Sequence, residues 1–143
     1  MKIIIDENPE YGKTGTLFGD FCIFADGFVF PYEEWTDFIF PVLDWWAEEL
    51  VSKCGSNGTI RLMFMDGSYE MTGCIKGSKI YLECFSDHFG TGDMLGTIEC
   101  TTEEFRKNLI CGLKRCKRFF IQNGNKKEVE KCSEKIRRLE KIA

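Results

Sequence analysis

The chain has 143 residues, 43% of them hydrophobic and 14% aromatic, and its formal net charge is −4. This length suffices for one domain with a buried core, spanning residues 1–143, and the apolar content excludes an intrinsically disordered chain. No apolar run approaches the roughly 18 residues of a membrane span. The short apolar run in MKIIIDENPE meets acid at once, unlike a signal peptide. We therefore expect a cytoplasmic protein without a membrane partner.

The net charge conceals an asymmetry along the chain. Residues 1–104 carry 6 Lys and Arg against 19 Asp and Glu, a net charge of −13. Residues 105–143 carry 13 Lys and Arg against 4 Glu, a net charge of +9. Such a division favours recognition of a charged partner, because it makes the molecule dipolar if the two parts lie on different faces.

The cysteine content is high, and nothing in the sequence indicates export, so free thiols are favoured over a disulfide framework. Most of the cysteines fall at apolar-phase positions, where cysteine behaves as a small hydrophobic residue. No pair has the Cys-x-x-Cys spacing, which disfavours structural zinc, and we expect neither a metal nor a cofactor. The eight cysteines are Cys22, Cys54, Cys74, Cys84, Cys100, Cys111, Cys116 and Cys132.

The N-terminal third reads as strands. Residues 2–6 form a short β-branched strand, and residues 8–15 are rich in turn formers. Residues 17–25 and 28–30 flank the pair Asp26-Gly27, which favours a tight hairpin.

The segment 30–53 holds all three tryptophans. Read as a helix, it places an apolar stripe opposite an acidic ridge, which we define as Asp37, Asp44 and Glu48, within about 40° of one another. Pro41 opposes one continuous helix, since proline lacks the backbone donor and clashes with the preceding turn. We expect a kink there, or a short first helix followed by a main helix from about Pro41 to Lys53. The stripe is Trp35, Ile39, Val42, Trp46 and Leu50.

A meander of strands follows, with short turns that require antiparallel pairing. Its strands are predicted at 59–65, 69–75, 79–85 and 96–100, with a polar loop at 86–93.

The C-terminal third reads as two helices. Thr101 and Glu104 fit a capping box at the start of the first, and residues 123–125 end it. The second runs to about Lys141. Taken with the strands, this order predicts an α+β fold, an antiparallel meander with hairpins packed against about three helices.

The acidic ridge has two interpretations. Charged helix faces are usually only solvated, but these acids also suit a docking surface for a basic partner. Trp45 lies at the border of the apolar stripe, and a half-exposed tryptophan beside acids is typical of an interface hot spot. The candidate binding residues are therefore Asp37, Asp44, Trp45 and Glu48.

The polar loop contributes two further candidates, Asp87 and Asp93, because a long polar loop in a compact domain often serves recognition. It also holds the single histidine, His88. A lone Asp-His neighbour pair is weak evidence for a small hydrolase, and no nucleophile or metal-binding motif accompanies it. We predict no catalytic residues and no enzyme activity.

The basic C-terminal helices offer an alternative function, a nucleic-acid or regulatory binding module using Lys107, Lys114 and Arg118. The acidic remainder would repel a polyanion, and few exposed aromatic residues accompany these cations for stacking, so nucleic acid is the less favoured partner. A third reading is that the basic faces balance the acidic body.

Residues 28–75 also resemble a known family. The runs Phe30-Pro31, Trp35-x-Asp37-Phe38 and Pro41-Val42-Leu43-x-Trp45-Trp46, followed by Phe64-Met65-Asp66-Gly67-Ser68-Tyr69, are similar to small immunity proteins of bacterial polymorphic-toxin and contact-dependent growth inhibition systems. The resemblance implies a single-domain cytoplasmic protein that binds and blocks one cognate toxin, commonly a nuclease, and it implies no catalytic residues. An acidic surface suits that role, because it complements the basic active site of a nuclease and speeds encounter.

Overall fold

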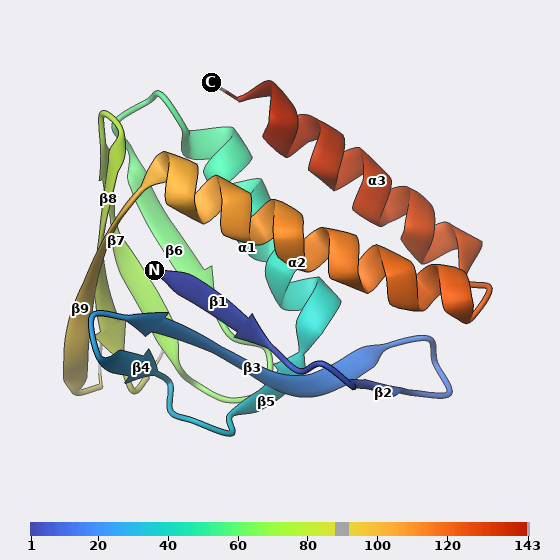
Figure 1. Ribbon diagram of the computed structural model, residues 1–143. Coiled ribbons are helices and arrows are strands. Elements are labelled where there is room, and N and C mark those ends of the chain that lie inside the picture. Colours follow the sequence, from blue (N-terminus) through green and yellow to red (C-terminus); the bar gives the residue numbers. More distant parts are fainter. Residues whose placement is uncertain (88–91, 143) are drawn as a thin grey trace.

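The computed structural model describes residues 1–87 and 92–142, which form two antiparallel sheets packed against helices (Figure 1). The predicted α+β class is confirmed, although the strands divide between two sheets. The elements are β1 (Lys2–Ile5), β2 (Glu10–Tyr11), β3 (Leu17–Ala25), β4 (Phe28–Phe30), β5 (Thr36–Phe38), α1 (Ile39–Lys53), β6 (Thr59–Met63), β7 (Glu70–Lys76), β8 (Lys79–Phe85), β9 (Met94–Thr101), α2 (Thr102–Gln122) and α3 (Lys126–Lys141).

The first sheet is built on β3, whose two halves pair with different strands. One half pairs with β1 and β4, and the other pairs with β2 and β5. The predicted hairpin is confirmed, since Ala25 pairs with Phe28 across Asp26 and Gly27, both of which have positive φ. Glycine adopts such angles without strain, which suits it to this turn.

The second sheet is the predicted meander, in the order β6-β7-β8-β9. Along β8, the buried residues Ile80, Leu82 and Cys84 alternate with exposed ones, as expected for a sheet with one face on the core. Because consecutive strands are antiparallel, the β6–β7 connection and the β8–β9 loop lie at the same end of this sheet.

Helix α1 lies between the sheets and the other two helices (Figure 1), packing on β6, β3, α2 and α3. Its Trp46 is fully buried, with ring centroids 5.2 Å from those of both Phe21 and Phe64. Phe21 belongs to the first sheet and Phe64 follows β6, so one apolar core joins both sheets.

Helix α2 begins as predicted. Thr101 accepts a hydrogen bond from the Glu104 backbone N–H, and the Glu104 side chain accepts one from the Thr101 backbone, which completes the capping box. An apolar stripe of α2 is buried in the core, and α3 starts after the predicted break at residues 123–125. The stripe is Phe105, Leu109, Leu113, Cys116 and Phe120.

The outer edge of β1 is closed by side chains of α2. Asn108 accepts a hydrogen bond from the Ile3 N–H at 2.9 Å, and Arg115 donates to the carbonyls of Ile5 at 3.2 Å and Asp6 at 3.1 Å. These contacts satisfy backbone groups that an edge strand otherwise leaves open.

The outer edge of β6 is closed in the same way by α1. Glu49 accepts from the Arg61 N–H at 3.1 Å, and Trp46 donates its indole N–H to the Met63 carbonyl at 2.8 Å.

Candidate partner-binding surfaces

The first part of the predicted helical segment is not a helix. After a cis Phe30–Pro31 bond the chain turns, and residues 36–38 pair with β3 as strand β5. Helix α1 starts at Ile39 and continues to Lys53. Of the two predicted alternatives, the kink at Pro41 is wrong, whereas the main helix from about Pro41 to Lys53 is confirmed to within two residues, with strand β5 before it in place of a short first helix. Pro41 lies in the first turn of α1, where backbone N–H groups have no helical partner to lose.

Asp37 is therefore not part of the acidic ridge. It lies on β5 with no exposed surface, so its predicted place on an exposed helix face is wrong. Its carboxylate accepts three hydrogen bonds, from the Phe38 N–H at 2.7 Å, the Asp66 N–H at 3.0 Å and the Trp35 indole at 3.1 Å. Burial raises the pKa of Asp37, and these hydrogen bonds act against the rise.

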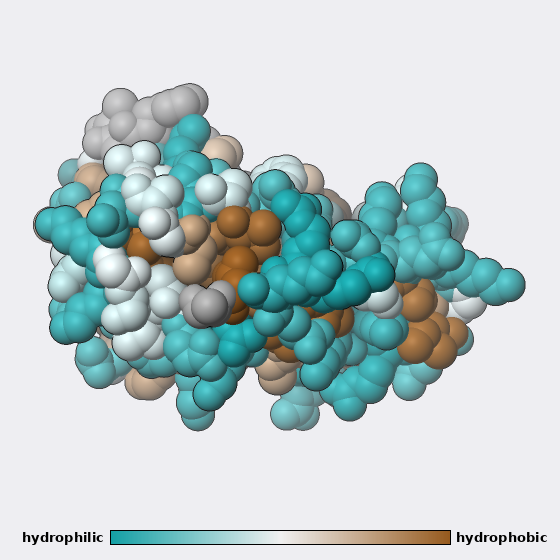
Figure 2. Space-filling view, turned by 90° about the horizontal axis from the view of Figure 1, so that it is seen from above, coloured by the Kyte–Doolittle hydropathy of each residue, from teal (hydrophilic) through white to brown (hydrophobic). Residues whose placement is uncertain are grey.

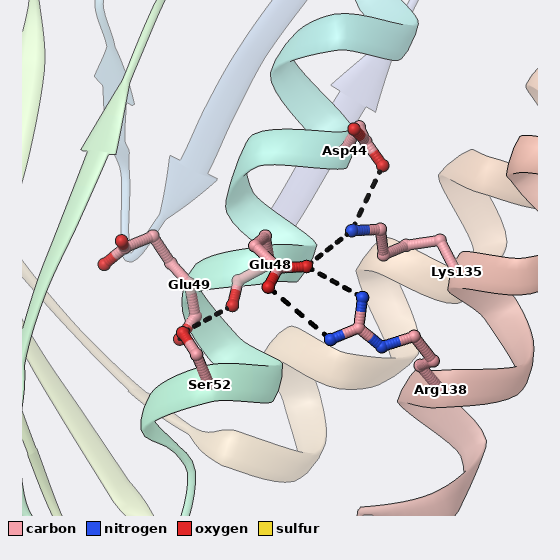
Figure 3. A network of polar contacts seen from close by, with 6 residues as sticks. All are labelled: Asp44, Glu48, Glu49, Ser52, Lys135 and Arg138. Atoms are coloured by element: carbon pink, nitrogen blue, oxygen red, sulfur yellow. Dashed lines mark hydrogen bonds and ion pairs between the residues drawn. The ribbon is translucent and has the colours of Figure 1, made fainter.

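Asp44 and Glu48 do share one face of α1, but α3 neutralises them (Figure 3). Lys135 Nζ lies 2.7 Å from Glu48 and 3.4 Å from Asp44, and Arg138 Nη1 lies 2.9 Å from Glu48. Hydrogen bonds from Lys135 and Arg138 lower the pKa of Glu48. Here the basic helix balances the acidic body, which was one of the readings of the sequence. The face of the molecule that is seen from above in Figure 2 is mainly hydrophilic, with a few hydrophobic patches.

Trp45 remains on the surface with 43% of its area exposed, beside a shallow hollow of about 310 Å³. Glu49, Arg61 and Met63 also line this hollow. Glu49 forms an ion pair with Lys53 at 3.0 Å and accepts a hydrogen bond from the Arg61 backbone N–H. The carboxylates beside Trp45 thus have partners within the protein.

A second acidic surface forms where three segments meet at the lower end of the molecule in Figure 1: the segment before β5, the β6–β7 connection, and residues 86–87 and 92–93 between β8 and β9. Three aromatic rings join the first two, with centroids 5.5 Å apart for Tyr32 and Trp35, and 5.1 Å apart for Trp35 and Tyr69. Gly67, at φ +123°, lies flat on Trp35, where a Cβ would come within 2.6 Å of the ring. The Ser68 hydroxyl donates to the Ser86 carbonyl at 3.2 Å, which joins the third loop.

We call this surface the acidic loop face. Its apolar members are well exposed, at 50% for Tyr32, 41% for Met65 and 53% for Met94. The segments 31–36, 65–69 and 86–94 contain no Lys or Arg. The acidic loop face comprises Tyr32, Glu33, Glu34, Met65, Asp66, Asp87, Asp93 and Met94, with all five carboxylates classed as exposed.

Asp37 lies beneath this surface and holds it together. Its two carboxylate oxygens bind the Trp35 side chain in the first loop and the Asp66 backbone in the second. The structure thus brings Asp87 and Asp93 of the predicted set to the acidic loop face, supported by Asp37, and separates them from Asp44, Trp45 and Glu48. Glu33, Glu34 and Asp66 were missed by the sequence reading.

The remaining predictions concern catalysis, metals and membranes. His88 lies outside the described residues. Within the described ranges, no three His, Cys, Asp or Glu side chains gather in a way that could hold a metal ion. Five cysteines are buried, and burial raises the pKa of Cys84, Cys100 and Cys132 to about 12. None of the helices in the described part of the chain is both long and apolar enough to cross a membrane.

Comparison of the chain with protein-family models, curated proteins and solved structures found no match. The resemblance to immunity proteins therefore stays a prediction.

Proposed function

We propose that this protein is a non-enzymatic immunity protein that neutralises a cognate, basic toxin by covering it with the acidic loop face. The observation that carries the proposal is the combination of five exposed carboxylates with exposed Tyr32, Met65 and Met94 in three neighbouring segments whose sequences contain no Lys or Arg.

The apolar residues supply the binding energy in this proposal. Tyrosine and methionine are enriched at protein interfaces, and large side chains that become fully desolvated dominate the affinity. Tyr32 is held by the rings of Trp35 and Tyr69, the latter with its centroid 6.2 Å away. A ring held in place before binding loses little side-chain entropy when a partner covers it.

The carboxylates supply steering and choice of partner. Complementary charge raises association rates and disfavours partners of the wrong sign. A nuclease is the suitable class of toxin, because its active site carries cations that hold phosphate groups, and an acidic surface can occupy such a site.

The proposal is tested with the toxin domain encoded next to this gene, by stopped-flow association and by growth protection in cells that express the toxin. Glu33→Lys with Asp66→Lys should slow association by about tenfold at low salt and reduce the salt dependence of the rate. Both side chains are exposed, so the pair should fold normally.

A matched control makes the same charge change elsewhere. Glu130 and Glu140 are exposed on α3, and Glu130→Lys with Glu140→Lys should slow association much less than the first pair when both are measured at the same low salt concentration. Equal effects of the two pairs would reduce the result to net charge and remove the acidic loop face from the proposal. The lack of a toxin gene nearby would count against the immunity function itself.

A further inference from the structure

The solvent-facing side of α2 carries a second surface, on different elements from the acidic loop face. Residues three or four apart on a helix share a face, and here they surround a shallow hollow of about 800 Å³. We call this surface the α2 groove. It is lined by Lys107, Ile110, Cys111, Lys114, Arg115, Lys117, Arg118 and Ile121.

The floor of the α2 groove is apolar. Ile121 is 57% exposed, Cys111 is exposed and Ile110 is half-buried. Ile110 is also partly packed against the core, whereas the exposed surfaces of Cys111 and Ile121 face water at a cost in free energy.

The rim of the α2 groove is cationic, with five Lys and Arg and no carboxylate among its residues. Arg115 donates hydrogen bonds to the carbonyls of Ile5 and Asp6, and Lys107 forms an ion pair with Glu103 at 3.5 Å. Lys114, Lys117 and Arg118 form no ion pair within residues 1–87 and 92–142. This differs from α3, where Lys135 and Arg138 are bound by carboxylates of α1.

We propose that the α2 groove is a docking site for an acidic, amphipathic helical segment of a partner protein. Ile110 and Ile121 are separated by about 16 Å along the helix axis, or three turns, which matches an apolar stripe of a partner helix. Carboxylates on both sides of that stripe would meet Lys114, Lys117 and Arg118. Their mutual repulsion would then be replaced by attraction.

Charge and lining decide between this occupant and others. A second copy packing α2 on α2 would place five cations against five, which is unfavourable. Single-stranded nucleic acid is recognised by aromatic side chains on which bases stack, whereas this lining is aliphatic. A segment that is both acidic and apolar satisfies the rim and the floor together.

The test is fluorescence anisotropy with the full chain and a labelled peptide of about 18 residues, with Leu at helical spacing and Glu on both sides of the Leu stripe. Comparison probes are a scrambled peptide of the same composition, a peptide with Lys in place of Glu, a single-stranded RNA of similar charge, and phosphatidylserine vesicles. We expect saturable binding of the patterned acidic peptide, and at least about tenfold weaker binding of the other probes.

Variants locate the binding. Two double variants should each weaken peptide binding by about tenfold or more: Lys114→Glu with Arg118→Glu, and Ile110→Ser with Ile121→Ser. Lys127→Glu with Lys141→Glu on exposed positions of α3 makes the same charge change and should alter the affinity by less than about twofold. Circular dichroism establishes that every variant is folded.

Several results would overturn the proposal: no binding of the patterned peptide, equal binding of the scrambled peptide, preference for RNA or vesicles, or equal loss in the α3 control. The outcome is independent of the proposed toxin neutralisation, because Glu33→Lys with Asp66→Lys should leave peptide binding unchanged.

Discussion

Two acidic regions of this protein have similar composition and different environments. On α1, Asp44 and Glu48 are bound to Lys135 and Arg138 of α3. On the acidic loop face, Glu33, Glu34, Asp66 and Asp93 are exposed, and none of these four forms an ion pair with another residue of the described ranges 1–87 and 92–142. Acidic side chains of similar density in the sequence can therefore belong to an internal ion-pair network or to a surface open to a partner. Which of the two it becomes depends on the cations that the fold brings near.

The largest expected effect concerns Asp37, which lies beneath the acidic loop face. Asp37→Ala removes the acceptor of three hydrogen bonds and leaves three donors in a buried site. We expect the free energy of unfolding to fall by about 3 kcal/mol in urea titrations. Asp44→Ala on the paired surface should cost less than about 1 kcal/mol. A loss of similar size from both would mean that Asp37 does not support the acidic loop face.

The pH dependence of stability should have opposite signs for the two regions. The pKa of Asp37 is raised in the fold, so as pH increases the unfolded chain loses this proton first, and stability falls until the raised pKa is passed. The pKa of Glu48 is lowered, so its contribution is present above the ordinary glutamate value and is lost as pH falls through the lowered pKa.

Paired variants isolate these contributions. The free energy of unfolding is measured by urea titration between about pH 3 and pH 7. Asp37→Asn should remove the loss of stability that the parent protein shows as pH rises, and Glu48→Gln should remove the loss that it shows as pH falls. Curves parallel to that of the parent protein for both variants would contradict the assignment.

Removing the cations that pair with Asp44 and Glu48 should test the difference between the two acidic regions. Lys135→Ala with Arg138→Ala frees Asp44 and Glu48, at a cost of about 1 kcal/mol of stability because these are partly exposed ion pairs. Association with a basic toxin should become about twofold faster through the added negative charge, without a change in the dissociation rate. A slower dissociation would instead place the ridge inside the interface.

The smallest expected effect is at Trp45. Because its ring lies half outside and its neighbouring carboxylates have internal partners, Trp45→Ala should change stability by about 0.5 kcal/mol and toxin affinity by less than about twofold. Isothermal titration calorimetry measures the affinity. A tenfold loss would restore the original hypothesis that α1 carries the contact.

The local patterns predicted most elements. The capping box of Thr101 and Glu104, the Asp26-Gly27 hairpin and the meander depend on neighbouring residues, and all are present. Residues 36–38 were mistaken for helix because Trp35, Ile39 and Val42 have helical spacing, and their true state depends on pairing with β3, some 18 residues earlier. Long-range pairing of this kind overrides local propensity.

The candidate surface was predictable in part. Antiparallel meander topology places the turn at Asp66 and the loop of Asp87 and Asp93 at the same end of the sheet, so their proximity follows from the predicted strands. The contribution of Glu33 and Glu34 does not follow, because it requires the β3–β5 pairing. The neutralisation of Asp44 and Glu48 also required knowing where α3 packs.

The closure of β1 by Asn108 and Arg115 has a bearing on biosynthesis. The Ile3 N–H and its acceptor on Asn108 are 105 residues apart, so the edge of the first strand stays open until at least residue 108 has been synthesised and has left the ribosome. Helix α1, by contrast, is synthesised immediately before the β6 edge that it covers. Nascent chains that stall before residue 108 therefore expose an unpaired edge beside an aromatic-rich β3, in which state neighbouring chains on a polysome can pair with it.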